Sequence, residues 1–129
     1  MIKAVESEKI PKPKAPYSPG VMAGDFLFVS GQIGVNPVTG EVPETVAEQT
    51  KQALENMKVV LEAAGASLDN VVKTTVFLSD ITSFEEMNKA YAEYFKGNLP
   101  ARSTIQAKLA RDIFKVEIEA TSYIGKQSV

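Results

Sequence analysis

The chain has 129 residues, which suits one domain with a single buried core. Its 14 Lys and Arg against 16 Asp and Glu give a net charge of −2, which argues against binding nucleic acid or an anionic membrane. It contains neither cysteine nor histidine, which excludes disulfides, a thiolate nucleophile, a Ser-His-Asp triad and the commonest zinc ligands. No signal-peptide-like or bilayer-spanning apolar run is present, so we expect a single cytoplasmic domain over residues 1–129.

The N-terminal segment, residues 9–19, carries four prolines, which prevent a regular helix or a central strand there. Tyr17 is held on this stiff, extended segment. Two interpretations of Tyr17 stay open: its ring covers the edge of the core with the hydroxyl in water, or it lines a site.

Residues 26–29 are almost all apolar, which predicts a strand buried on both faces. Ser30 and Gly31 follow this strand. Small residues at such a point let another backbone or a ligand approach closely. Residues 36–40 have the composition of a turn.

Two helices and a strand are predicted in the middle of the chain. Thr45 and Glu48 form a capping-box pattern for a helix that ends at Gly65. Residues 71–78 are rich in β-branched side chains and predict a strand. Ser83 and Glu86 repeat the capping-box pattern for a second helix, over residues 84–97. Its apolar stripe is typical of a core, and Asn88 lies beside that stripe.

The stretch from residue 100 to residue 120 contains two runs with a period of two, joined by a short polar link. Folded as a hairpin, they would place Arg102, Glu117 and Glu119 on one polar face. A solvated sheet face is the plain interpretation. However, Pro100 ends the preceding helix, so Arg102 enters the sheet at a corner, where its planar guanidinium suits a carboxylate.

The element order predicts an α+β fold with two helices packed on one face of a mixed sheet. The strand at residues 26–29 would need cover on its second face, which favours an oligomer. The last residues, 125–129, read as a loose tail.

Several segments together resemble the Rid family of YjgF-type reactive-intermediate deaminases. The matches run in order over about residues 7–123, and the combination is specific although each piece is weak. The matching segments are Pro16-Tyr17, residues 30–33, residues 36–40, residues 72–76, Pro100-Ala101-Arg102-Ser103 and residues 116–120.

This resemblance implies a chorismate-mutase-like fold assembled as a homotrimer with intersubunit clefts. It implies hydrolysis of 2-imino acids, such as 2-iminopropanoate and 2-iminobutanoate, to 2-keto acids and ammonia without a metal or cofactor. By the same resemblance Arg102 binds the substrate carboxylate and Glu117 is linked to the attacking water. The resemblance adds Tyr17 as a third catalytic residue, and Ser30, Gly31, Asn88 and Thr104 as substrate-binding residues of the cleft.

Thr104 replaces a cysteine found in several members, at a position expected to act through its backbone. Many members also have proline where this chain has Ala110, which affects the turn more than the site.

Two other functions remain open. One is a non-catalytic trimer in which Arg102 captures a small carboxylate for regulation. The other is an RNA-acting translation inhibitor, which the acidic balance and the lack of a basic stripe disfavour. An assay of imine decay separates the enzyme from the binder.

Overall fold

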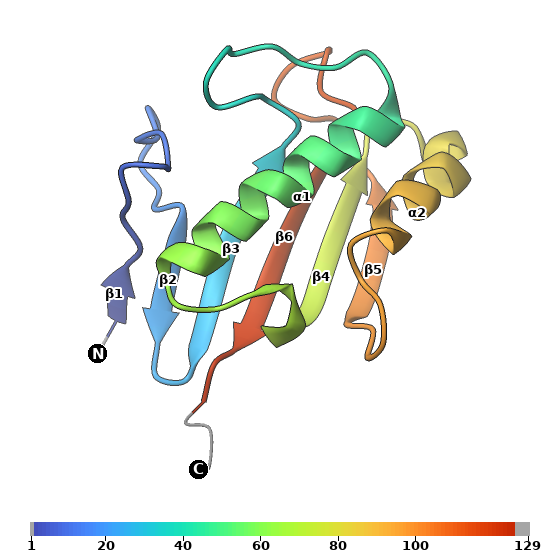
Figure 1. The fold of residues 1–129 in the computed structure, drawn as a ribbon. Helices are drawn as coiled ribbons and strands as arrows, with labels where there is room; N and C mark the ends of the chain where they lie inside the picture. The colour runs from blue at the N-terminus through green and yellow to red at the C-terminus, as the bar shows by residue number, and fades with distance from the viewer. Residues whose placement is uncertain (1, 126–129) are drawn as a thin grey trace.

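The structure, a computed structural model, describes residues 2–125 and contains one six-stranded sheet and two α-helices (Figure 1). The predicted tail lies outside the described residues except for Gly125. The strands are β1 (Ile2–Ala4), β2 (Gly20–Ala23), β3 (Phe26–Ile33), β4 (Val71–Leu78), β5 (Ala101–Gln106) and β6 (Val116–Tyr123). The helices are α1 (Val46–Ala63) and α2 (Phe84–Ala92), with short 3-10 turns at Leu68–Asn70 and Ile81–Ser83.

Helix α1 forms where the sequence predicts it, with the Thr45 half of the predicted capping box. The Thr45 hydroxyl accepts a hydrogen bond from the Glu48 amide at 3.1 Å, which satisfies one of the free N–H groups of the first turn. Gly65 follows the helix with a φ of 77°, a left-handed conformation that suits glycine. The face toward the sheet is buried along the whole helix: Val46, Gln49, Thr50, Ala53, Leu54, Met57, Val60 and Leu61.

Helix α2 starts by a different route from the predicted capping box. Ser83 makes no capping bond, because it already belongs to the 3-10 turn that leads into the helix. Asp80 caps that turn by accepting a hydrogen bond from the Thr82 amide at 2.9 Å. Glu86 instead accepts from the Ala47 amide at 3.0 Å, so it caps the first turn of α1. The helix also ends earlier than predicted, at Ala92.

The predicted hairpin of the last two strands is wrong. The strand order is β1-β2-β3-β6-β4-β5, so β4 lies between β6 and β5. Strand β5 pairs in parallel with β4, and helix α2 makes the crossover between them, whereas β6 pairs antiparallel with β3 and β4. The mixed sheet with two helices confirms the α+β class.

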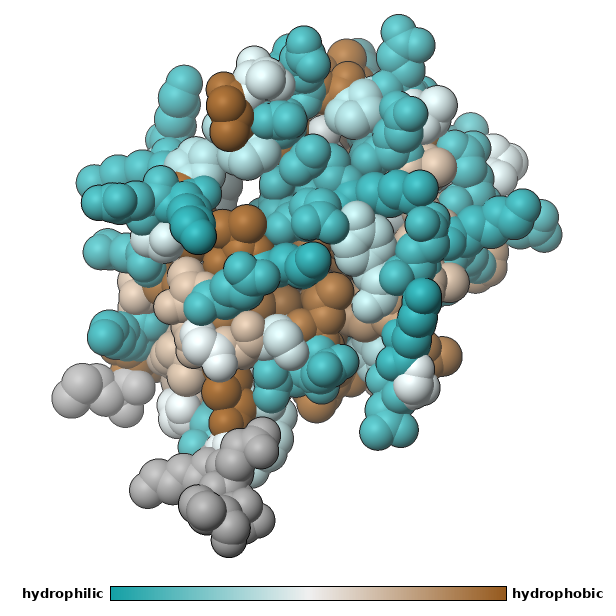
Figure 2. Space-filling view, viewed as in Figure 1, coloured by the Kyte–Doolittle hydropathy of each residue, from teal (hydrophilic) through white to brown (hydrophobic). Residues whose placement is uncertain are grey.

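Both helices cover the same side of the sheet (Figure 1). Seen from that side, the surface is mostly hydrophilic, with apolar side chains visible between the charged ones (Figure 2). Beneath the helices lie the buried strand residues, among them Leu27, Val76 and Ile118. On the other side, which we call the open face, Phe28 remains 47% exposed. The predicted burial of residues 26–29 on both faces therefore does not occur within one chain.

Candidate functional site

The strand register places Arg102 and Glu117 on opposite faces of the sheet. Arg102 is aligned with Thr74 on β4, and Thr74 is aligned with Ala120 on β6; both partners are buried under the helices. Glu117 is aligned with Phe77, one strand position away from that series, so it points to the open face. The prediction that Arg102 shares a face with Glu117 is wrong, because β4 and not β6 is the neighbour of β5.

The Arg102 guanidinium lies against two aromatic rings of α2. Its carbon Cζ is 4.9 Å from the Tyr91 ring centroid and 5.5 Å from the Phe84 ring centroid. Both distances fall within the range of cation–π contacts. Within residues 2–125 Arg102 forms no salt bridge, so its charge is not neutralised by Glu117 or by any other carboxylate.

Two buried oxygens without hydrogen-bond partners belong to residues beside Arg102. They are Oδ1 of Asn88 and Oγ1 of Thr104. Asn88 lies one helical turn after Phe84 and one before Tyr91, so it shares the α2 face on which the guanidinium rests. Thr104 follows Arg102 by two residues on β5 and therefore points to the same side of the sheet. Unpaired buried oxygens are uncommon in folded proteins, and the described residues contain one more, the Ser122 hydroxyl on β6.

The Glu117 side chain lines a cavity of about 450 Å³ on the open face. Its lining combines polar and apolar groups: Tyr17, Ser30, Gly31, Ile33, Ala110, Phe114, Glu117 and Glu119. The carboxylate lies directly against Gly31, where an added Cβ would be 2.3 Å from Oε2 of Glu117. Only glycine fits at that position without moving the carboxylate, so the group that approaches Gly31 closely is a side chain and not the backbone or ligand that the sequence led us to expect.

The pKa of Glu117 is raised above its ordinary value. Burial contributes most, because it penalises the charged form, and the nearby carboxylate of Glu119 adds to the shift. A half-buried carboxyl group with a raised pKa in a cavity is suited to exchanging protons with a bound ligand or water.

Ser30 and Tyr17 connect the N-terminal segment to this cavity. The Ser30 hydroxyl donates to the Ser18 carbonyl at 2.6 Å, and the Ser30 amide donates to the Pro19 carbonyl at 3.0 Å. These bonds tie residues 18–19 to the end of β3. Tyr17 lines the cavity with its side chain 57% exposed, so it does not act as a core cover.

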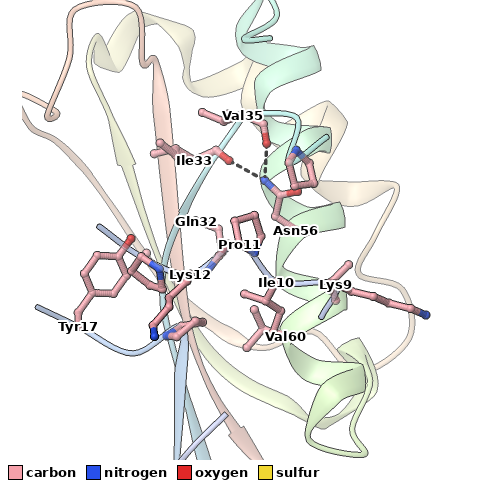
Figure 3. Close-up of a pocket in the computed structure, with 15 residues that line it drawn as sticks. Lys9, Ile10, Pro11, Lys12, Tyr17, Gln32, Ile33, Val35, Asn56 and Val60 are labelled. Atoms are coloured by element: carbon pink, nitrogen blue, oxygen red, sulfur yellow. Dashed lines mark hydrogen bonds between the residues drawn. The ribbon is translucent and has the colours of Figure 1, made fainter. Parts of the chain in front are cut away.

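A second cavity of about 280 Å³ lies between the proline-rich segment and helix α1. Tyr17 stands on one side of it and Asn56 on the other, with Ile10 and Pro11 between them (Figure 3). The Asn56 side-chain amide donates to the carbonyls of Ile33 and Val35, at 3.0 and 2.9 Å, which fixes the chain after β3. This cavity shares Tyr17, Gly31 and Ile33 with the cavity at Glu117.

The predicted site residues therefore form two groups. Arg102, Asn88 and Thr104 gather where β5 meets α2. Tyr17, Ser30, Gly31 and Glu117 gather around the open-face cavity.

Sequence reasoning missed the aromatic support of Arg102 by Phe84 and Tyr91, because their periodicity also fits a core. It also missed the apolar cavity walls, Ile33 and Phe114. Within residues 2–125 no cluster of three or more His, Cys, Asp or Glu could hold a metal ion, and neither helix is long and apolar enough to cross a membrane.

Comparison with known proteins gives consistent matches over nearly the whole chain. A family model described as Endoribonuclease L-PSP matches residues 7–124. A RutC family protein of Pyrococcus horikoshii is 46% identical over 125 residues, which cover 95% of this chain and 98% of the relative. The 2-iminobutanoate/2-iminopropanoate deaminase of Escherichia coli is 44% identical over 124 residues, covering 93% of this chain and 96% of that protein.

A solved structure extends the likeness to the fold. The crystal structure of Escherichia coli TdcF with bound serine matches this structure with a TM-score of 0.87 and 38% identity. The match covers 94% of this chain and 98% of the TdcF chain.

Proposed function

The chain belongs to the family described as Endoribonuclease L-PSP, which is the YjgF/Rid family, and from this premise we propose that it hydrolyses 2-imino acids to 2-keto acids and ammonia. The observation that carries the proposal is the environment of the Arg102 guanidinium. Its guanidinium is supported by two aromatic rings, lacks a carboxylate partner within residues 2–125, and lies beside two unpaired oxygens.

Arg102 would bind the substrate carboxylate. A guanidinium presents parallel N–H groups that match both oxygens of a carboxylate, and the charge makes these hydrogen bonds strong. The Tyr91 and Phe84 rings restrict where the guanidinium can lie, so its fork is oriented before substrate arrives. The serine bound in the TdcF crystal structure supports a ligand derived from an amino acid.

Glu117 would act on the water and the nitrogen. Water adds its oxygen to the imine carbon, and its proton passes through the carboxyl group to the nitrogen, giving a carbinolamine. The carboxyl group then carries the hydroxyl proton to the amino nitrogen as the carbon–nitrogen bond breaks and the carbon–oxygen double bond forms, so that ammonia and the 2-keto acid result. The raised pKa of Glu117 suits both directions of this transfer. Tyr17, Ser30 and Gly31 would shape the cavity around the reacting atoms.

The positions of Arg102 and Glu117 favour an assembly of several copies of the chain. Because Arg102 and Glu117 lie on opposite faces, one chain cannot direct both at one small substrate. A second copy whose β5 edge docks beside the open-face cavity would complete the site. We propose a homotrimer with a chorismate-mutase-like arrangement and three intersubunit clefts. The exposed apolar residues of the open face support such cover: Phe26, Phe28, Ile105 and Tyr123.

The experiment is an imine-decay assay. An amino-acid oxidase generates 2-iminobutanoate from 2-aminobutanoate in the presence of semicarbazide, and formation of the semicarbazone is followed with and without the protein. The wild-type protein should divert the imine to 2-ketobutanoate, and Arg102→Ala should not. A carboxylate-binding protein without catalytic activity would leave the rate unchanged. Incubation of RNA with the protein under the same conditions, followed by measurement of RNA cleavage, tests the endoribonuclease activity named in the family description.

A further inference from the structure

We propose that the cavity between the proline-rich segment and helix α1 binds small apolar carboxylic acids, with Lys12 as the partner of the carboxylate. The cavity has a volume of about 280 Å³. It adjoins the cavity at Glu117, with which it shares three wall residues, but neither Glu117 nor Arg102 lines it. The inference therefore does not depend on the imine hydrolysis proposed above.

The cavity exists because the proline-rich segment is attached to the sheet at its two ends. At one end the Val5 amide donates to the Gly20 carbonyl at 2.8 Å, and at the other end Ser30 bonds the carbonyls of residues 18–19. Within the described part of the chain, residues 6–17 make only local hydrogen bonds with one another. The prolines restrict the backbone between the two attachments, so the segment arches over α1 and leaves the cavity open.

The walls of the cavity are mainly apolar. Val59 and Val60 line it from α1, and Ile10 lines it from the proline-rich segment. Asn56 lies one turn earlier on the same face of the helix (Figure 3). Both N–H groups of its side chain donate to carbonyls, and its oxygen accepts from Gln52, so this wall already has its hydrogen bonds. Such walls favour the hydrocarbon part of a ligand.

Two lysines add positive charge to the cavity. Lys9 and Lys12 both line it, and neither forms a salt bridge within residues 2–125. Lys12 lies toward Tyr17, whereas the Lys9 side chain extends away from Tyr17 (Figure 3). No carboxylate of the described residues lines this cavity, because Glu6 and Glu8 line an adjoining hollow enclosed by the same segment. The cavity therefore favours an anion, and Lys12 is its expected partner.

These features limit the class of ligand. The ligand must be small, because the volume lies just below the range of about 300–1,000 Å³ that is usual for pockets of drug-sized ligands. A sugar acid or a phosphate ester would leave many of its polar groups against apolar walls without hydrogen bonds. A monocarboxylic acid with a short hydrocarbon chain places the chain against Val59 and Val60 and the carboxylate at Lys12.

The test uses propanoate, butanoate and pentanoate, with pentanamide as the uncharged counterpart of pentanoate. In NMR titrations the methyl signals of Val59 and Val60 should shift with each acid. The affinity should rise about 4-fold for each added methylene group, the effect of burying that group. Pentanoate should bind about 3-fold more tightly than pentanamide, as expected for one ion pair at a partly exposed position.

Four variants locate the site. Lys12→Gln should bring the ratio of the pentanoate and pentanamide affinities toward 1. Lys14→Gln is the matched control, because Lys14 belongs to the same segment but does not line the cavity, and it should keep the ratio. Val59→Phe should weaken both ligands by filling the cavity. Arg102→Ala should leave the binding of pentanoate at Val59 unchanged, because Arg102 does not line this cavity.

Four results would overturn the inference. They are methyl signals of Val59 and Val60 that do not shift, an affinity that does not rise with chain length, a preference for pentanoate over pentanamide that survives Lys12→Gln, and binding that disappears in Arg102→Ala. The last result would place the acid at the proposed reaction site. None of these results bears on imine hydrolysis, which the assay of imine decay tests separately.

Discussion

Arg102 and Glu117 point to opposite faces of one sheet, with only strand β4 between the strands that carry them. Arg102 lies on the helix side against Tyr91, and Glu117 lies on the open side against Gly31. If both act on one substrate, they must belong to different copies of the chain. The quaternary structure would then be part of the catalytic site and not only a source of stability.

The first prediction uses this division. Arg102→Ala and Glu117→Gln should each be inactive alone, but co-refolded in equal amounts they should regain imine hydrolysis. A site is complete when Arg102 comes from one variant chain and Glu117 from the other, so about a quarter of the sites in randomly mixed trimers should be intact. The measurement is the rate of semicarbazone-coupled imine decay before and after mixing.

A mixture of two Glu117→Gln preparations, treated in the same way, is the control and should stay inactive. Activity that does not return in the mixed sample would mean that both groups act within one chain or that one of them is not catalytic. Mass spectrometry of the mixed sample under native conditions verifies that hybrid assemblies have formed.

The second prediction concerns Glu117 and pH. Because its pKa is raised in the folded state, the folded chain binds the proton more tightly than the unfolded chain. Stability from this group is therefore greatest at low pH and is lost as the pH rises from about 4.3, the ordinary value for glutamate, through the raised folded pKa. Glu117→Gln should melt at a higher temperature than the wild type at pH 8, and the difference should vanish near pH 4.

The same variant should lose activity while it gains stability. Removing an acid-base group reduces the rate by roughly 10²- to 10⁴-fold. A Glu117→Gln protein that melts lower than the wild type at pH 8, or that keeps most of its activity, would contradict this assignment. Glu119→Gln serves as a comparison, because it removes a neighbouring charge and should lower the pKa seen in the pH–rate profile.

The sequence predicts local features of the fold well. The Thr45 cap and the Gly65 end of α1 depend on interactions within a few residues, and both occur as expected. The second cap fails because Glu86 reaches another helix, a contact that spacing along the chain does not reveal. The period of two in β5 correctly separates its faces, but it does not say which face the helices cover.

The site could be predicted only in part for the same reason. The alternation of Arg102 with its neighbours is visible in the sequence, yet its strand partner depends on non-local pairing. The strand–helix–strand order of β4, α2 and β5 was an available signal for a parallel pair, because parallel strands need a crossover. The contact between Gly31 and Glu117 joins residues far apart in the sequence, and nothing in its periodicity indicates it.

The third prediction concerns two glycines. In Gly31→Ala the new Cβ would meet the end of the flexible Glu117 side chain, so the carboxylate should move and the fold should tolerate the change. Activity should fall by roughly 10²-fold, as expected for a displacement of about 1 Å in a catalytic group. In Gly34→Ala the new Cβ would lie 2.7 Å from backbone atoms of Gln49, which cannot move as freely.

Gly34→Ala should therefore lower the free energy of unfolding by about 1–3 kcal/mol, whereas Gly31→Ala should change it much less. Urea denaturation followed by circular dichroism gives both values. Equal loss of stability in the two variants would mean that Gly31 serves packing and not the position of Glu117.

The fourth prediction addresses assembly. Light scattering should give about 42 kDa for the wild type, which is three times the chain mass of 14.0 kDa. Phe28→Asp places a charge on the exposed apolar part of the open face, so it should shift the protein toward 14.0 kDa and abolish activity. Glu62→Lys, on the exposed side of α1, is the control and should leave the mass unchanged. A wild type that is a stable monomer at micromolar concentration would contradict the trimer and its shared cleft.

The last prediction separates binding from stability at Arg102. A buried ion pair, once broken, destabilises a fold by about 3–5 kcal/mol, but Arg102 has no such pair within residues 2–125. Arg102→Ala removes the cation–π contacts with the Tyr91 and Phe84 rings, worth about 0.5–1 kcal/mol each at partly exposed positions. Its melting temperature should therefore change little. Its affinity for pyruvate should fall by about 2–5 kcal/mol, a factor of tens to thousands.

Arg102→Lys refines the same experiment. Lysine keeps the positive charge but lacks the planar fork and stacks less well on an aromatic ring. It should recover part of the affinity lost in Arg102→Ala and little of the activity, because the carboxylate would be attracted but not oriented. A crystal soaked with pyruvate should show both carboxylate oxygens on the wild-type guanidinium. Pyruvate bound elsewhere, or full activity in Arg102→Lys, would show that the orientation given by Arg102 is not what the reaction requires.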